Sequence, residues 1–139
     1  MTLGNLMTRN PVTVSLDDTL GAVRDIFERH HFHHVLVVDG PQLVGVVSDR
    51  DLLKALSPNL GLPSETSRDL ATLKKRVHQI MTRDLIVLKE DATVREAIEL
   101  FNSHRISCIP IVDAHRAPVG ILSWRDILKA IARGEPPRS

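Results

Sequence analysis

The chain has 139 residues, of which 42% are hydrophobic and 25% are charged, and its formal net charge at pH 7 is +1. These values are typical of a soluble globular protein, built as one domain or as two small halves that share a core. The balanced charge and the 3% content of aromatic residues argue against a nucleic-acid-binding surface. No apolar run approaches the roughly 20 residues that a membrane helix needs, and the N-terminus lacks the features of a secretion signal. Cys108 is the only cysteine, so no internal disulfide can form, and we expect a cytoplasmic protein.

The first half of the chain has a pattern that predicts the order β-α-β-β-α. A proline at position 11 favours an extended lead-in before the first strand. Alternating residues indicate a short strand, apolar residues spaced by three and four indicate a helix, and unbroken apolar runs indicate covered strands. The expected elements are a strand at 12–14, a helix from about 20, strands at 35–38 and 43–47, and a short helix at 49–56.

A segment rich in proline, glycine and serine follows at 57–64 and indicates a linker. Thr66 or Ser67 is a suitable cap for a connecting helix, which we expect to run from about Arg68 to Ile80. We interpret the basic residues at 74–76 as a solvated face of this helix.

The second half repeats the first. Met81-Thr82-Arg83 matches Met7-Thr8-Arg9 at an offset of 74 residues, and the offset becomes 75 from Gly120 onward, which places an extra residue in the turn at 114–117. Such a repeat implies two copies of one supersecondary unit. We expect a three-stranded sheet in each copy, and an α/β (α+β) fold in which the copies pack face to face about a pseudo-twofold axis. The predicted division is repeat 1 at 1–57, linker and connecting helix at 58–80, repeat 2 at 81–133 and a frayed tail at 134–139.

Each repeat carries the pattern Gly-x-x-Ser-x-x-Asp, at 45–51 and at 120–126. An aspartate carboxylate can accept hydrogen bonds from both hydroxyls of a ribose, and the serine adds a donor and acceptor one turn away. The glycine allows close approach of a neighbour or a ligand. The same Ser-x-x-Asp pattern also predicts a capping box at a helix start, and the two roles are compatible in one residue.

The repeated motifs resemble those of a tandem pair of CBS domains, the Bateman module. They are Met-Thr-Arg at 7–9 and 81–83, the apolar runs that end in Asp39 and Asp113, and the two Gly-x-x-Ser-x-x-Asp stretches, which together span about residues 5–133. The resemblance implies the β-α-β-β-α unit twice, with two clefts that often bind AMP, ADP or ATP and sometimes S-adenosylmethionine. It also implies that ribose is held by Ser48 and Asp51 and by Ser123 and Asp126.

Further site residues follow from their positions in the family. An apolar slot for adenine would be formed by Val12, Val14, Ile86, Val87, Ile109 and Pro110, and packing in the core is the competing interpretation for each. Phosphate groups would be met by Arg50, Arg125 and His34, with solvent exposure or surface pairing as the alternative. The two sites are expected to differ in affinity, because Leu36, Asp49 and the pair His33-His34 stand where the second repeat has Pro110, Trp124 and Ser107-Cys108.

Two other kinds of site are not expected. The histidines at 30, 31, 33 and 34 straddle a helix end and a strand without an acidic or cysteine partner at ligand spacing, so pH-sensitive anion binding fits them better than a metal. Cys108 begins an apolar strand and is interpreted as a buried structural thiol. Neither a hydrolase nucleophile turn nor a phosphate-binding Gly-x-x-x-x-Gly-Lys loop is present. We therefore expect no catalytic residue and no enzyme activity.

The sequence thus predicts a regulatory module that requires no cofactor, binds an adenine nucleotide in one or both clefts, and signals to a separate, unidentified partner protein. Two alternatives are a dimeric interaction scaffold without a ligand and an S-adenosylmethionine sensor. A homodimer is expected in either case, and binding to nucleic acid or membrane is not. The helix faces expected to form the dimer are Leu52/Leu53/Leu56 and Ile127/Leu128/Ile131.

Overall fold

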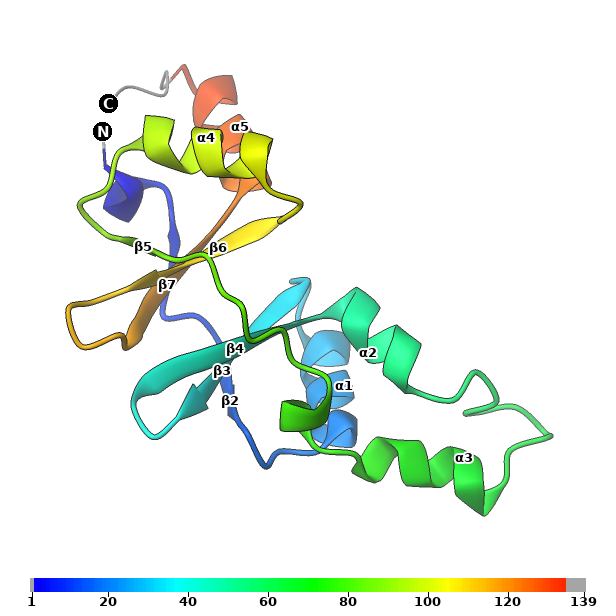
Figure 1. Ribbon diagram of the computed structural model, residues 1–139. Helices are drawn as coiled ribbons and strands as arrows, with labels where there is room; N and C mark the ends of the chain where they lie inside the picture. The colour runs from blue at the N-terminus through cyan, green and yellow to red at the C-terminus, as the bar shows by residue number, and fades with distance from the viewer. Residues whose placement is uncertain (1, 135–139) are drawn as a thin grey trace. The chain divides into compact units, whose positions relative to one another are not determined.

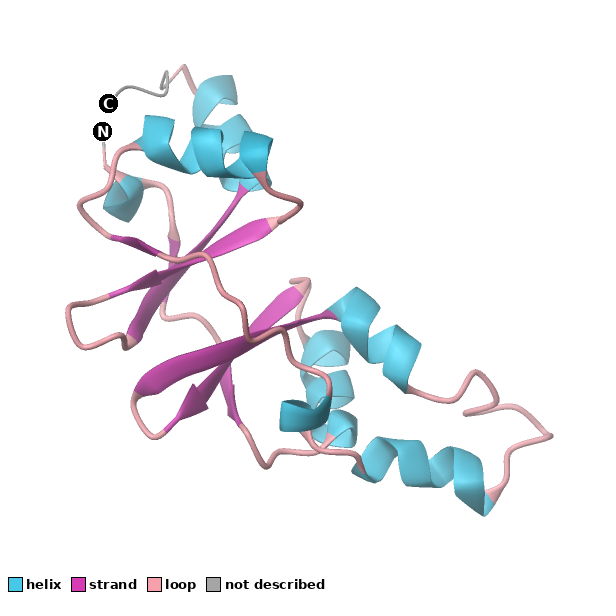
Figure 2. Cartoon of the chain, in the orientation of Figure 1, coloured by secondary structure: helices cyan, strands magenta, loops and turns pink. Residues whose placement is uncertain are grey.

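The structure, a computed structural model, describes residues 2–134 and contains the β-α-β-β-α unit twice (Figures 1 and 2). The first part of the chain contains the 3-10 helix η1 (Leu3–Asn5), β1 (Thr8–Arg9), β2 (Thr13–Ser15), α1 (Leu20–Arg29), β3 (His34–Asp39), β4 (Gln42–Ser48) and α2 (Asp49–Ala55). The remainder contains α3 (Ser67–Ala71), η2 (Thr72–Lys74), η3 (Val77–Gln79), β5 (Leu88–Lys89), α4 (Val94–Ser103), β6 (Cys108–Val112), β7 (Pro118–Ser123) and α5 (Trp124–Ala132). The α/β prediction with two β-α-β-β-α repeats is confirmed, as β2-α1-β3-β4-α2 and β5-α4-β6-β7-α5.

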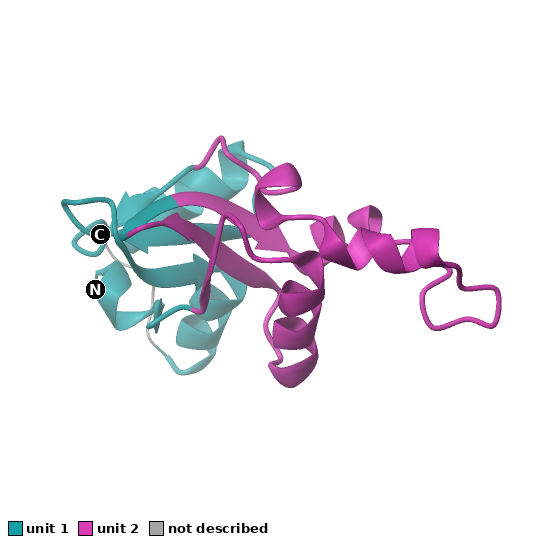
Figure 3. Ribbon diagram, turned by 90° about the horizontal axis from the view of Figure 1, so that it is seen from below, with its two compact units in different colours: residues 1–11, 41–43, 86–139 teal, residues 12–40, 44–85 magenta. Residues whose placement is uncertain are grey.

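The chain forms two compact units that interleave segments of the two repeats (Figure 3). Unit 1 comprises Met1–Pro11, Pro41–Leu43 and Ile86–Ser139, and unit 2 comprises Val12–Gly40 and Val44–Leu85. The first residues of the chain therefore belong with the second repeat in space. The predicted tail lies outside the described residues, apart from Gly134.

Unit 2 is built on a three-stranded sheet in the order β2-β3-β4, with α1 and α2 on one face (Figure 1). β2 and β3 are parallel, and Val14 lies opposite Val37. Helix α1 begins where the Thr19 hydroxyl accepts a hydrogen bond from the Ala22 backbone N–H. The apolar sides of these elements form one core, whose buried members are Val14, Leu20, Val23, Val35, Val37, Val47, Leu52, Val77 and Met81.

Unit 1 has a four-stranded sheet in the order β1-β7-β6-β5, where we expected three strands. The fourth strand is β1 from the lead-in of the first repeat, in which Thr8 lies opposite Ile121 and Arg9 opposite Gly120. Periodicity identifies strands but not their partners, and the pairing joins residues more than a hundred positions apart. The core of this unit is formed by Leu3, Leu6, Met7, Val94, Ala97, Ile109, Ile111, Leu122, Ile127 and Ala130.

The segment that precedes each repeat crosses to the other repeat's unit. In unit 1 the Leu3 N–H donates to the carbonyl oxygen of Ala92 at 3.1 Å. In unit 2 the Val77 N–H donates to the carbonyl oxygen of Asp18 at 2.9 Å. The two hydrogen bonds are equivalent, because Val77 corresponds to Leu3 and Ala92 corresponds to Asp18 at the offset of 74 residues. Leu3 and Val77 are each fully buried. Each unit is thus completed by a segment that the linear order of the repeats assigns to the other half.

The predicted single helix from Arg68 to Ile80 is wrong. Its start is correct, because Thr66 and Asp69 form a capping box at the beginning of α3. The helix ends at Ala71, and after the 3-10 turn η2 the chain becomes extended at Lys75, whose carbonyl accepts the Leu20 N–H at 2.9 Å. These tertiary hydrogen bonds and the burial of Val77 outweigh the local helical periodicity. Among the described residues, no helix is both long and apolar enough to cross a membrane.

Candidate functional site

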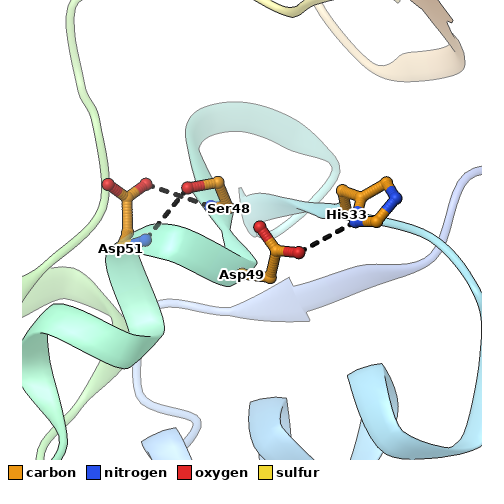
Figure 4. Close-up of polar contacts among 4 residues, drawn as sticks. All are labelled: His33, Ser48, Asp49 and Asp51. Atoms are coloured by element: carbon orange, nitrogen blue, oxygen red, sulfur yellow. Dashed lines mark hydrogen bonds and ion pairs between the residues drawn. The ribbon is translucent and has the colours of Figure 1, made fainter.

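The two Gly-x-x-Ser-x-x-Asp motifs form capping boxes of the same geometry. At the start of α2 the Asp51 N–H donates to Ser48 Oγ at 3.0 Å, and the Ser48 N–H donates to Asp51 Oδ2 at 3.0 Å (Figure 4). At the start of α5 the corresponding distances between Asp126 and Ser123 are 3.2 and 2.9 Å. The capping interpretation of both motifs is therefore confirmed.

Capping leaves part of each carboxylate unoccupied. Between residues 2 and 134, no hydrogen bond is made to Oδ1 of Asp51 or of Asp126. A carboxylate offers about four acceptor positions, and each capping box uses one of them. The bond to the backbone also holds the carboxylate in one orientation. Each aspartate is thus a half-buried, pre-oriented acceptor that remains able to receive hydroxyl donors.

Gly45 and Gly120 of the motifs approach protein rather than open space. A Cβ at Gly45 would lie 3.0 Å from Met81 Cγ, and a Cβ at Gly120 would lie 2.9 Å from Met7 Cγ. Of the two explanations for these glycines, a neighbour and a ligand, the structure shows the neighbour.

A pair of charged residues accompanies the first capping box. His33 Nδ1 lies 2.8 Å from Asp49 Oδ2 (Figure 4). The Asp49 backbone N–H also donates to the His33 carbonyl oxygen at 2.9 Å. Burial lowers the pKa of the adjacent His34, and Asp49 and Asp51 partly oppose this effect. The sequence interpretation missed this contact. It could have been inferred because both partners change together between the repeats, to Ser107 and Trp124.

The second capping box has different surroundings. Trp124 occupies the position of Asp49, is 48% exposed, and has the Arg125 guanidinium 5.8 Å from its ring centroid, within cation–π range. Cys108 is buried at the start of β6, and burial raises the pKa of its thiol to about 12. The thiol is therefore neutral and structural, as expected. Within the described residues, no three histidine, cysteine or acidic side chains gather as metal ligands.

The other candidates are divided between the units. Arg50 and Arg125 are exposed beside the two aspartates, and His34 is half-buried at the start of β3. Val14 and Ile109 lie in the cores of units 2 and 1, which agrees with the packing interpretation. Pro110 is buried within β6. Unit 2 thus holds Ser48, Asp51, Arg50, His34 and Val14, and unit 1 holds Ser123, Asp126, Arg125, Val87, Ile109 and Pro110.

Val87 is not brought close to the aspartate of its own unit. It lines a shallow hollow of about 350 Å³ with Leu88, Lys89, Val112, Asp113, Ala114 and Arg116. Ser123 lies opposite Cys108 at the start of β6, whereas this hollow lies at the end of β6. Within unit 1, Val87 and Asp126 are therefore at opposite ends of the strand.

The fold and the twice-repeated capping motif define a pair of CBS domains. The CBS domain family matches residues 3–58 and 77–133, and the chain belongs to this family. Among curated relatives, inosine-5'-monophosphate dehydrogenase of Methanocaldococcus jannaschii is 34% identical over 125 residues, which are 89% of this chain and 22% of that enzyme. The chain thus spans about a fifth of the length of the first curated relatives that it matches. The uncharacterized protein MJ1426 of the same organism is 31% identical, with 88% of this chain and 87% of that protein covered.

Solved structures of similar fold include two with bound adenosine derivatives. The CBS domain pair of protein MJ0100, in complex with 5'-methylthioadenosine and S-adenosyl-L-methionine, has a TM-score of 0.79 and 27% identity, with 96% of this chain and 98% of that chain covered. CBSX2 in complex with AMP has a TM-score of 0.78 and 25% identity, with the same coverage of both chains. The ligands in these two relatives share an adenosine moiety and therefore a ribose.

Proposed function

We propose that this protein is a regulatory module that binds an adenine nucleotide, AMP, ADP or ATP, through the carboxylates of Asp51 and Asp126. The observation that carries the proposal is the repeated capping box. In both repeats of this CBS pair it orients an aspartate whose Oδ2 accepts the capping hydrogen bond and whose Oδ1 remains available. AMP bound to a relative of similar fold supports the class of ligand.

The geometry favours ribose as the group recognised at each aspartate. The two hydroxyls of a ribose are donors, and hydrogen bonds to an ionised carboxylate are about twice as strong as neutral ones. Because the capping bond already fixes the carboxylate, little side-chain entropy would be lost when a ligand binds. The serine Oγ accepts from the aspartate N–H and keeps its own hydrogen as a donor for the ligand.

The proposal extends to assembly and signalling. Trp124, Leu128 and Ile131 are 48%, 52% and 47% exposed and follow one another at helical spacing on α5. Leu53 on α2 is 74% exposed. We propose that these residues contact a second copy of the chain. The expected faces need correction, because Leu52 and Ile127 are buried in the cores of their own units. We further propose a non-catalytic, cytoplasmic protein that passes ligand occupancy to a separate partner.

S-adenosylmethionine is the second candidate ligand, because a similar CBS pair binds it together with 5'-methylthioadenosine. The unequal surroundings of the two capping boxes favour unequal affinities. A scaffold that binds no ligand is the outcome that the following experiment would identify.

The test measures thermal unfolding of the full chain with AMP, ADP, ATP and S-adenosylmethionine. A ligand at 100 times its Kd should add about 2.7 kcal/mol to the free energy of unfolding. Asp51→Ala and Asp126→Ala should each remove the binding at one repeat. Asp69→Ala is the matched control, because it breaks a third capping box in a segment outside both family matches and should leave binding intact. Unchanged melting with all four ligands at millimolar concentration would contradict the proposal and favour the scaffold.

A further inference from the structure

The His33–Asp49 pair leaves one imidazole nitrogen available beside the first capping box. Asp49 contacts His33 twice, through its backbone N–H and through Oδ2 at Nδ1. In the described part of the chain, Nε2 of His33 makes no hydrogen bond, and the His33 side chain is 58% exposed. Figure 4 shows this pair and the Ser48–Asp51 capping box at the start of the same helix. The imidazole is thus held at one nitrogen and open to a ligand at the other.

Protonation of His33 removes the net negative charge at this place. Asp49 and Asp51 carry two negative charges on the first turn of α2, and Arg50 carries one positive charge. With neutral imidazoles the group is anionic and would repel a phosphate. A proton on His33 cancels this net negative charge, and histidine is the side chain that ordinarily changes charge between pH 5 and 8. The acids and the histidines interact electrostatically, since Asp49, His33 and Asp51 each affect the pKa of His34.

The second repeat lacks this change of charge. Ser107, Cys108 and Trp124 stand where the first repeat has His33, His34 and Asp49. The charged groups that remain beside the second capping box are Arg125 and Asp126, which balance each other. Because the Cys108 thiol has a pKa of about 12, it stays neutral in this range. The chain therefore contains an internal control for the effect of the histidines.

We propose that the His33–Asp49 pair couples binding of a phosphorylated adenosine at the first repeat to proton uptake, and that the second repeat binds independently of pH. This inference rests on the proposed function. A proton from solvent adds to the His33 ring, Nδ1–H donates to Asp49, and Nε2–H donates to a phosphate oxygen. Asp49 is a positioning residue, because it orients the imidazole and compensates its charge without contacting the ligand. The ligand that gains is the one with a phosphate, so the pair also selects AMP over adenosine.

The experiment is calorimetric titration of AMP and adenosine into the full chain at pH 6.5 and pH 8.0. The Asp126→Ala variant reports the first repeat alone, and the Asp51→Ala variant reports the second. In the Asp126→Ala protein, AMP should bind about tenfold more weakly at pH 8.0 than at pH 6.5, a loss comparable to one charge-assisted hydrogen bond. The affinity for adenosine should be the same at both pH values. His33→Ser, which introduces the residue of the second repeat, should abolish most of this difference. Ionisation of AMP itself is common to all variants and cancels in the comparison.

Two further measurements separate the possible results. Titration in buffers of different ionisation enthalpy should show proton uptake with AMP at the first repeat, and Asp49→Asn should reduce both the uptake and the selectivity for AMP. Equal pH dependence with and without His33, or at both repeats, would overturn the inference while leaving the proposed function intact. Absence of AMP binding to the unmodified chain at both pH values would overturn both.

Discussion

Met81 packs directly against Gly45, so the Met-Thr-Arg motif of one repeat and the glycine motif of the other are contact partners. A Cβ on Gly45 would lie 2.5 Å from Met81 Sδ and 3.1 Å from the carbonyl oxygen of Thr82. The Thr82 N–H donates to the Val46 carbonyl oxygen at 2.9 Å, and the Val46 N–H donates in return at 3.1 Å. Met7 occupies the same place over Gly120 in unit 1. This contact explains why the two motifs recur together in both halves.

Gly45→Ala should therefore destabilise the protein. The added methyl group has no room, because Met81 is only 7% exposed and the next neighbour is backbone. Overpacking of this kind costs about 1–3 kcal/mol, which urea unfolding would measure as a lower midpoint with an unchanged slope. Gly120→Ala should behave alike.

The matched control is Gly21→Ala in α1, where the nearest atom to the new Cβ, the Leu73 carbonyl oxygen, is at an ordinary 3.4 Å. That change should stabilise the protein by about 0.5–1 kcal/mol, because alanine is the better helix former. In a Met81→Ala background the cost of Gly45→Ala should shrink. Equal costs in both backgrounds would show that Met81 is not what excludes the methyl group.

The segment around α3 should loosen in acid through Asp69. A hydrogen bond from the Ser57 hydroxyl at 2.7 Å, followed by one from the Thr66 N–H, lowers the pKa of Asp69 below its ordinary value of 3.8. A lowered pKa in the folded state adds stability that is present above pH 3.8 and is lost as the pH falls through the folded value. The unmodified chain should thus be more stable than Asp69→Asn at pH 6, and this difference in stability should shrink as the pH falls below 3.8.

Urea unfolding of both proteins across this range is the measurement. Ser57→Ala removes the hydrogen bond that lowers the pKa of Asp69 most. It should therefore reduce the difference in unfolding free energy between the proteins with aspartate and with asparagine at position 69. A difference that is constant from pH 6 to pH 2 would mean that the carboxylate charge does not stabilise this segment.

Leu128→Glu should convert the proposed homodimer to monomer. Leu128 lies between Trp124 and Ile131 on the exposed face of α5, and a charge buried in a dimer contact without a partner is strongly unfavourable. Sedimentation at micromolar concentration would detect the change. Trp124, the only tryptophan, should shift its emission to the red as it becomes solvated.

Leu62→Glu is the control for this experiment, since Leu62 is similarly exposed, at 51%, but lies in the linker. If the unmodified chain already sediments as a monomer, the proposed dimer is wrong. Dissociation caused equally by both substitutions would place the contact elsewhere.

The elements and their caps could be predicted from the sequence because their signals are local. The alternation and the 3.6-residue spacing gave both β-α-β-β-α units, and Ser-x-x-Asp predicted the capping boxes at Ser48 and Ser123. These signals lie within a few residues of the structure that they form. The two candidate carboxylates and their equivalent positions in the repeats could therefore be predicted from the sequence.

The partners of each segment were decided only by the tertiary structure. Residues 8–9 pair with β7, and Lys75 and Val77 leave the expected helix to bond Leu20 and Asp18. The His33–Asp49 contact joins residues 16 positions apart. Local periodicity shows which side of an element is apolar. It does not show which segment, distant in the sequence, pairs with the backbone N–H and carbonyl groups of that element. That choice depends on the burial and backbone pairing of the whole chain, because an unpaired N–H or carbonyl group is costly wherever water is excluded.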